Sequence, residues 1–221
     1  MPICFTFIGW HNSGKTSLAQ KIVKAFVQKG LKVGVIKSTK HSSIAEHPVN
    51  SDSYKLKNAG AYSVALACPD QLILFRPDPK YRFEYLAFKL FPEADLVIGE
   101  GFKNDPDALK IEVTRQGVGE GLLADKVPNV VAIVADFDIG RENSFHVDDI
   151  NGIVQFIENR FMDTKDIEPK AEMFGDKKKI FLKYFVRKAL TGLLFGFATS
   201  LKGTENIKSI EIKAELDKKS L

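Results

Sequence analysis

Apolar and polar residues follow two different periods along the first 160 residues of the chain. Leu18, Ile22, Ala25 and Phe26 recur at helical spacing with polar residues between them, which predicts an amphipathic helix over residues 17–28. Short, nearly continuous apolar runs flank this segment and recur after it, as is typical of buried strands. The predicted strands are residues 3–8, 33–36, 62–67, 72–75, 96–98, 110–114 and 130–134, and the other predicted helices are residues 51–58, 85–91 and 148–161.

The order of these elements predicts the fold class. Residues 3–36 give a strand, a helix and a strand, the βαβ unit whose two strands are parallel and whose crossover is right-handed. Residues 38–50 form a polar loop, and further strands then alternate with helices. We therefore predict an α/β fold built on a doubly wound, mostly parallel sheet.

The pattern changes between residues 163 and 175, which are polar and charged and include Pro169 and Gly175. We predict a linker here, between a domain of residues 1–162 and a small α+β accessory module of residues 176–221. A βαβ-like order is predicted for the module, with a strand at 180–182, a helix at 184–200 and a strand at 207–212. Its helix has a long apolar face, so we expect this face to pack on the main domain or on a second copy of the module.

Charge separates the same two parts of the chain. There are 32 Lys and Arg against 28 Asp and Glu, and residues 176–221 hold 11 of the basic but only five of the acidic residues. The basic excess therefore belongs to the accessory module, where it fits either an anionic partner or an ordinary solvated face. We expect neither nucleic acid nor a membrane among the partners.

Cysteine usage and hydropathy are typical of a cytoplasmic protein. Cys4 and Cys68 are too few for a disulfide framework or a zinc site, and both lie in apolar runs, so we expect buried free thiols. The longest apolar stretch, residues 189–201, is well short of the roughly 20 residues that span a membrane. No signal segment precedes the first predicted strand, which favours a cytoplasmic location.

The turn between the first strand and the first helix carries the most specific motif. Gly9, Gly14, Lys15 and Thr16 match the phosphate-loop pattern G-x-x-x-x-G-K-[ST] in its strand–loop–helix context, although an incidental glycine-rich turn is the alternative. Such a loop cradles a polyphosphate with backbone N–H groups and the helix N-terminus, while Lys15 would bind the β- and γ-phosphates and Thr16 would bind Mg²⁺. We predict a P-loop NTPase fold. The candidate phosphate-binding residues are Gly9, Asn12, Ser13, Gly14, Lys15, Thr16 and Ser17.

Acidic side chains near two other elements are candidates for the metal site. Glu100 follows the apolar strand at 96–98, as a Walker B acid does, so we predict that it binds Mg²⁺ and takes part in catalysis with Lys15. A Glu exposed in a glycine turn is the alternative. Asp52 is either a further metal ligand or the N-terminal cap of its helix. Asp95 is disfavoured, because it enters the strand at the opposite end.

Further polar residues follow the remaining strands. Lys37 ends the second strand and fits either phosphate neutralisation or a plain strand terminus. Asp136 follows the strand at 130–134, where a carboxylate could accept hydrogen bonds from N1–H and N2–H₂ of guanine. The usual Asn-Lys-x-Asp guanine signature is absent, so a simple loop acid is an equal interpretation. The four histidines are scattered and show no metal-binding spacing.

Taken together, the motifs resemble one family. The segments GWHNSGKTSL, GLKVGVIKSTKHS, DSYKLKNAGA, DLVIGEGFK and KIEV, in this order over residues 3 to about 160, are similar to the molybdopterin-guanine dinucleotide biosynthesis adapter proteins. The phosphate loop alone is shared by many NTPases, whereas its combination with E-G-F-K and D-S-x-x-x-x-x-A-G-A is far more specific. This chain departs from the histidine-rich run that often follows VIK in the family, because Ser38 and Lys40 replace two histidines and leave His41.

The resemblance implies a homodimer that binds GTP and Mg²⁺ with weak intrinsic hydrolysis. It implies the molybdenum cofactor guanylyltransferase as partner, which joins GMP to molybdopterin, with molybdopterin as a candidate ligand and a molybdoenzyme or tungstoenzyme as acceptor. Gly14, Lys15 and Thr16 match the family's phosphate and metal positions. Glu100 matches the acid near the metal, Asp52 the loop acid, and Lys103 the basic residue after E-G-F. The accessory module lies outside the family pattern.

Three other functions use the same loop. A small-molecule kinase needs lid arginines, and no Arg-rich lid segment is present, although Arg76, Arg82, Arg115 and Arg141 are single candidates. A nucleotide-dependent scaffold could deliver the cofactor without catalysis. A dimeric switch ATPase carries an extra lysine directly after the first loop glycine, and Trp10 at that position disfavours this class.

Overall fold

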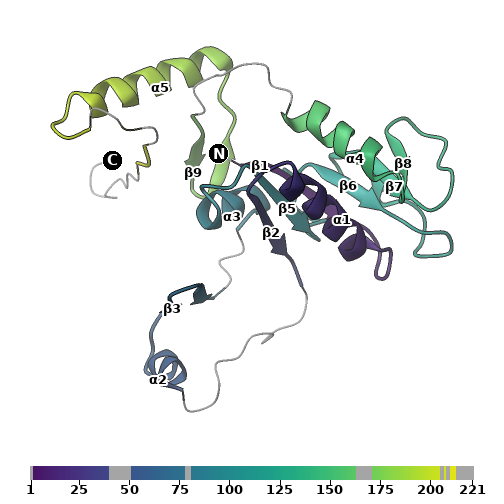
Figure 1. Ribbon diagram of the computed structural model, residues 1–221, viewed down its shortest axis with the longest axis horizontal. Helices are drawn as coiled ribbons and strands as arrows, with labels where there is room; N and C mark the ends of the chain where they lie inside the picture. The colour runs from purple at the N-terminus through teal and green to yellow at the C-terminus, as the bar shows by residue number, and fades with distance from the viewer. Residues whose placement is uncertain are drawn as a thin grey trace. The chain divides into compact units, whose positions relative to one another are not determined.

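The computed structural model describes residues 2–39, 51–77, 81–162, 171–204, 207 and 210–212. The chain divides into two compact units, residues 2–162 and residues 163–221. In the first unit a six-stranded sheet has the order β2-β5-β1-β6-β7-β8, and every neighbouring pair of strands is parallel (Figure 1). The predicted parallel α/β sheet is therefore confirmed.

The sheet and its helices follow the predicted order closely. The strands are β1 (Ile3–Ile8), β2 (Val33–Lys37), β5 (Leu96–Glu100), β6 (Lys110–Val113), β7 (Val130–Ala135) and β8 (Ser144–His146), and the helices are α1 (Lys15–Gln28), α3 (Phe83–Leu90) and α4 (Ile150–Ile157). The edge strand β8 was not predicted, because three residues with one apolar side chain give no periodic signal. The helix predicted over 148–161 is α4 followed by a π-helical turn (Glu158–Met162).

Alternate residues of the central strands pack into two hydrophobic cores, one on each face of the sheet. On one face Phe5 and Phe7 of β1 are fully buried against residues of α1 and α4 such as Ile22 and Ile157. On the other face Phe83 of α3 is buried in a cluster with Val97 of β5 and neighbouring residues. Helices cover both faces, as the doubly wound prediction requires.

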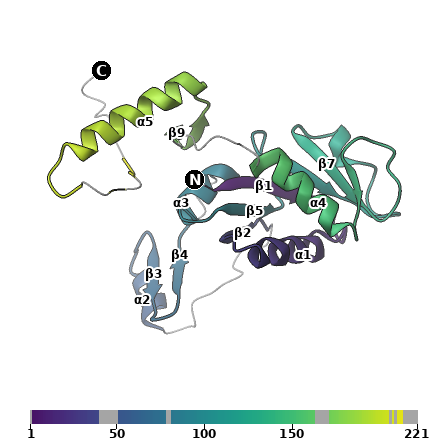
Figure 2. The same ribbon diagram turned by 45° about the horizontal axis from the view of Figure 1, so that its top comes forward.

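A separate hairpin lies between β2 and α3 in the sequence. It consists of the antiparallel strands β3 (Val64–Ala67) and β4 (Leu72–Phe75), and β3 contacts the short helix α2 (Asp52–Asn58) (Figure 2). A tight turn joins the two strands, in which the Cys68 N–H donates to Gln71 O at 2.8 Å. The prediction of buried thiols is wrong, because Cys68 is exposed on this thin hairpin and Cys4 is only half-buried.

The C-terminal unit differs from the βαβ-like prediction. An antiparallel hairpin of β9 (Met173–Gly175) and β10 (Lys178–Ile180) precedes α5 (Tyr184–Thr199), so β9 lies inside the predicted linker. Residues 207 and 210–212, the described part of the predicted last strand, are not in a strand. Asp176 and Lys177 form the hairpin tip with φ of 48° and 67°. Two-residue hairpins need such left-handed residues, and the pair lacks the glycine that normally signals them.

None of the helices in the described part of the chain is long and apolar enough to cross a membrane.

Candidate functional site

The loop between β1 and α1 depends on two glycines. A Cβ at Gly9 would lie 2.2 Å from Val113 O and 2.5 Å from Ser13 Oγ, so no other residue fits there. Gly14 has φ 91° and directly precedes α1, whose first turn has no side-chain cap among the described residues. The first N–H groups of α1 are therefore free of side-chain caps, as in an anion-binding helix terminus.

Lys15 folds back over this loop. Its Nζ donates to Trp10 O at 2.6 Å and to Gly9 O at 3.1 Å, and it lies 3.5 Å from Ser13 Oγ. Burial lowers the pKa of Lys15, the Glu100 carboxylate opposes this shift, and the nearby Lys37 and Lys103 ammonium groups lower the pKa further. An anion placed here would relieve both the desolvation and the repulsion between cations.

Glu100 is the acidic centre of the site. The Thr16 hydroxyl lies 2.9 Å from both Glu100 carboxylate oxygens, and Lys37 Nζ lies 3.0 Å from Oε1. Strand register explains the convergence, because Glu100 pairs with Lys37 of β2 on one side and with Phe7 of β1 on the other. The structure thus brings together Thr16, Lys37 and Glu100, which lie far apart in the sequence.

The glycines on either side of Glu100 have a steric cause. A Cβ at Gly99 would lie 2.6 Å from Thr6 Oγ1 and 2.8 Å from the Phe83 ring. Gly101 has φ 103°, and its N–H donates to Phe7 O at 2.9 Å. Both glycines let β5 run close to β1 while Glu100 stays at the carboxyl end of the strand, so the interpretation of Glu100 as an exposed turn residue is wrong.

The remaining candidate residues of the loop and strand ends have distinct environments. Ser13 is fully buried, whereas Ser17 in the first turn of α1 and Asn12, with φ 61°, are exposed. Lys103 Nζ lies 5.4 Å from the centre of the Trp10 ring. Asp136 is exposed and accepts a hydrogen bond from the Gln116 N–H at 2.9 Å, so one of its oxygens holds the loop after β6.

Asp52 is not the cap of its helix. Ser51 occupies that position and accepts from the Tyr54 N–H at 3.2 Å, whereas Asp52 pairs with Lys55 at 3.1 Å and its side chain is 94% exposed. Within the described residues no hydrogen bond or ion pair joins Asp52 to Thr16 or Glu100. A role for Asp52 in metal binding stays a prediction.

The site offers oxygen atoms that could bind a metal ion, but among the described residues they do not form a complete set of ligands. In the part of the chain that the structure describes, no group of three or more His, Cys, Asp or Glu side chains could hold a metal ion. Mg²⁺ usually takes one or two protein ligands together with phosphate oxygens and water. The Thr16 hydroxyl and the Glu100 carboxylate fit that type of site.

Sequence reasoning missed Glu112 and named Arg115 only as a single candidate for a lid arginine. Glu112 of β6 is fully buried, and its two carboxylate oxygens accept from the Leu123 and Ala124 N–H groups at 2.7 Å. Arg115 lies beside the loop, since a Cβ at Gly14 would be 3.2 Å from Arg115 Nε. A charged residue inside an otherwise apolar strand, as in K-I-E-V, was the available signal for Glu112.

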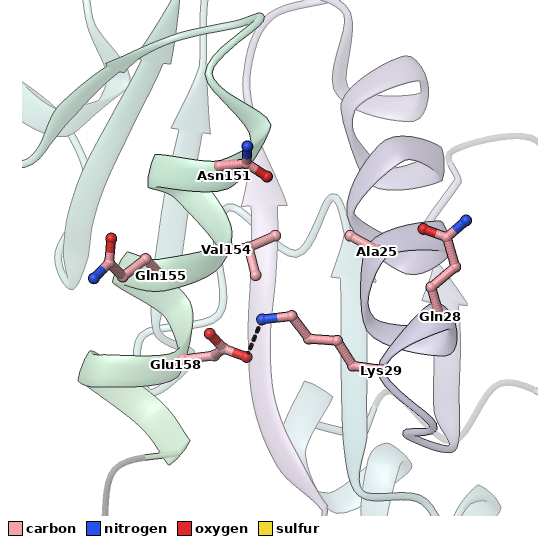
Figure 3. A pocket seen from close by; sticks show the side chains of 7 residues that line it. All are labelled: Ala25, Gln28, Lys29, Asn151, Val154, Gln155 and Glu158. Carbon is pink, nitrogen blue, oxygen red and sulfur yellow. Dashed lines mark hydrogen bonds and ion pairs between the residues drawn. The ribbon is translucent and has the colours of Figure 1, made fainter.

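A surface groove lies between α1 and α4, away from the phosphate loop. Its lining residues come from the C-terminal half of α1 and from α4, with one ion pair between Lys29 and Glu158 (Figure 3). The phosphate loop precedes the other end of α1, so this groove is not part of the site.

The chain is similar in sequence and fold to known proteins. A family model described as molybdopterin guanine dinucleotide synthesis protein B (MobB) matches residues 4–136. The chain is 30% identical to the molybdopterin-guanine dinucleotide biosynthesis adapter protein of Escherichia coli over 159 residues, which cover 68% of this chain and 89% of that protein. It is 26% identical to a putative adapter protein of the same description from Methanocaldococcus jannaschii, and this match covers 96% of the chain and 97% of the relative. A crystal structure of MobB superimposes with a TM-score of 0.55 at 24% identity, over 72% of this chain and 99% of that one.

Proposed function

This chain belongs to the molybdopterin guanine dinucleotide synthesis protein B (MobB) family, and we propose that it is a GTP-binding adapter with low GTPase turnover. The relatives named above are adapter proteins of molybdopterin-guanine dinucleotide biosynthesis. In this role the chain assists the attachment of GMP to molybdopterin. The observation that carries the nucleotide part of the proposal is the convergence of Lys15, Thr16 and Glu100 at the phosphate loop.

Charge at the loop supports a polyphosphate ligand. Lys37 and Lys103 both lie close enough to Lys15 to lower its pKa, and Glu100 is the acid that raises it. The cluster therefore has a net positive charge that an anion of several charges would neutralise. Backbone N–H groups of the loop and the first turn of α1 would supply the remaining hydrogen bonds.

Magnesium would bind beside Thr16 and Glu100. When bound, the ion supplies charge neutralisation at the β- and γ-phosphates. Thr16 contributes its hydroxyl, and Glu100 acts directly or through a metal-bound water. Without the metal, Lys37 forms an ion pair with Glu100. Its ammonium then balances the carboxylate charge that Mg²⁺ would balance when bound.

Guanine recognition is assigned to Asp136. One of its carboxylate oxygens accepts from the Gln116 N–H, and the side chain is otherwise exposed after β7. The second oxygen would be available to a guanine edge, which offers two donors where adenine has none in that arrangement. Asp136→Asn should therefore reduce the preference for GTP over ATP.

The test of the proposed function is a comparison of nucleotides by titration calorimetry in the presence of Mg²⁺. GTP should bind more tightly than ATP, and removal of Mg²⁺ should weaken the binding of GTP. If ATP bound tenfold more tightly than GTP, a difference of about 1.4 kcal/mol, the GTP-binding proposal would be overturned.

Hydrolysis is tested through Glu100. Glu100→Gln keeps the size and a ligand oxygen but removes the negative charge, so GTP turnover should fall about tenfold while nucleotide affinity changes less than about threefold. Glu93→Gln is the matched control, because Glu93 is exposed before β5. Unchanged turnover in Glu100→Gln would exclude this residue from catalysis and favour a non-catalytic scaffold.

The proposed partners are the molybdenum cofactor guanylyltransferase and a second copy of this chain. The hairpin strand β4 supports a homodimer, because Leu72 and Leu74 are 70% and 45% exposed and a lone two-stranded hairpin is marginally stable. The double variant Leu72→Asp, Leu74→Asp should sediment as a monomer in analytical ultracentrifugation. Val27→Asp on α1, 53% exposed, is the control and should leave the mass unchanged. A variant of unaltered mass would remove the hairpin from the interface.

A further inference from the structure

Trp10 follows the first glycine of the phosphate loop. The ammonium groups of two lysines lie close to its ring. Lys103 Nζ lies 5.4 Å and Lys126 Nζ 5.2 Å from the ring centre, within the range of cation–π attraction. At this position the dimeric switch ATPases have an extra lysine, whereas here an indole gathers two ammonium groups. Lys103 also belongs to the cluster of cations around Lys15, so its placement bears on phosphate binding.

The indole itself is firmly held by the loop of residues 115–126. Its Nε1 donates to Gly121 O at 2.9 Å, and a Cβ at Gly119 would lie 2.2 Å from Trp10 Cδ1, so the backbone of Gly119 touches the ring. Glu112 and Asp136 fix this loop near its two ends through hydrogen bonds to backbone N–H groups. The ring is thus a fixed surface and not a freely rotating side chain.

Lys103 reaches this ring through an unusual backbone turn. Gly101 and Phe102 have φ of 103° and 55°, and a left-handed Phe is rare because of its side chain. The Phe102 ring packs against the buried Phe83 at 5.0 Å between ring centres, which holds the strained turn in place. The chain after Glu100 is therefore directed toward Trp10 by packing, not by chance.

The two lysines differ in their relation to the phosphate site. Lys103 is near enough to Lys15 to lower its pKa. Lys126 is exposed, and its Nζ donates to Glu120 O at 2.6 Å. Trp10 O meanwhile accepts from Lys15 Nζ at 2.6 Å. Trp10 therefore contacts two lysines of the cluster around the phosphate loop, Lys15 through its carbonyl oxygen and Lys103 through its ring.

We propose that Trp10 is a positioning residue of the phosphate site, whose indole holds the Lys103 ammonium beside Lys15 so that both bind the same polyphosphate. This inference rests on the proposed function only in that the loop binds a phosphate chain; it does not require guanine. Lys126 stabilises the loop of residues 115–126 through the same ring and takes no part in anion binding.

The experiment measures dissociation constants by calorimetry for tripolyphosphate and for GTP with Mg²⁺. Lys103→Ala and Trp10→Leu should each weaken both ligands by about tenfold, and the double variant should be no weaker than either single variant. Trp10→Phe keeps an aromatic face and should retain most of the affinity. Lys126→Ala removes an ammonium at nearly the same distance from the ring and should bind both ligands within about twofold of the wild type. The proposal is overturned if the Trp10→Leu and Lys103→Ala effects add, or if Lys126→Ala matches Lys103→Ala.

Trp10 also supplies a signal that a purely structural role would not give. It is the single tryptophan of the chain, so fluorescence excited selectively at tryptophan reports on this ring alone. Tripolyphosphate should change the emission of the wild type and of Lys126→Ala by drawing the Lys103 ammonium toward the anion, and should leave the emission of Lys103→Ala unchanged. An equal response in Lys103→Ala would contradict the proposal.

The two ligands separate this inference from the proposed function. If tripolyphosphate follows the expected pattern and GTP does not bind, the GTP-binding function fails while the role of Trp10 stands. If GTP binds normally to Trp10→Leu and Lys103→Ala, the role of Trp10 fails while the GTP-binding function stands. If the wild type binds neither ligand, both are overturned.

Discussion

The sheet of residues 2–162 and the helix α5 of the C-terminal unit bury their apolar residues to very different extents. All residues of β5 and β6 are buried, and Phe5 and Phe7 are fully inaccessible to solvent. No residue of α5 is buried, and Phe185 and Phe197 are 78% and 64% exposed. Both segments are apolar in sequence, so composition does not explain the difference.

The difference lies in the number of layers available to each segment. A parallel sheet with helices on both faces encloses its central strands completely. In the described part of the C-terminal unit, a hairpin of two three-residue strands accompanies α5, and no residue of this helix is buried. The candidate site belongs to the enclosed region, because only a fixed sheet edge can bring Lys37, Glu100 and the phosphate loop together.

Replacement of one phenylalanine in each region gives the largest contrast. Phe5→Ala should lower the free energy of unfolding by about 3–5 kcal/mol, because it opens a cavity beneath α1 and α4. Phe185→Ala removes the same atoms from an exposed site and should change the free energy of unfolding by less than about 0.5 kcal/mol. Urea unfolding followed by circular dichroism measures both. Equal losses would show that the exposed face of α5 is covered in solution.

Lysine substitutions compare the two regions by function. Lys15→Ala should weaken GTP binding by about a hundredfold or more, because charged hydrogen bonds to phosphate are lost at the loop. Lys188→Ala on α5 removes an exposed lysine of the basic unit and should leave GTP affinity unaltered. Calorimetry gives both constants. A large loss in Lys188→Ala would place part of the anion site in the C-terminal unit.

A smaller effect should appear with pH. The pKa of Lys15 in the free protein is below 10.5, chiefly through burial, and a bound phosphate would raise it again. The complex then holds more protons than the free protein, so affinity is full below the lowered pKa and decreases as the pH rises above it. Lys15→Arg keeps its charge and should remove this decrease. Affinity that is constant with pH in the wild type would contradict the assigned direction.

Local patterns were sufficient for most of the main unit. The β1–loop–α1 motif and the apolar strands were predicted from periodicity and glycine placement, because these signals lie within a few residues of one another. The hairpin tip at Asp176 and Lys177 was missed, since its left-handed residues are not glycines. The edge strand β8 was missed because its pairing with β7 is decided across the sheet.

For the site, the sequence by itself determined which residues are the candidates for phosphate chemistry: Lys15 and Thr16 through the loop motif, and Glu100 through its place after an apolar strand. The tertiary structure decided their partners. Strand register places Lys37 against Glu100. The loop of residues 115–126 fixes the Trp10 ring, and the Lys103 ammonium lies near this ring. Such contacts join residues some 60 to 110 positions apart, and no local period can encode them, because they form only when the parallel sheet has aligned its strand ends.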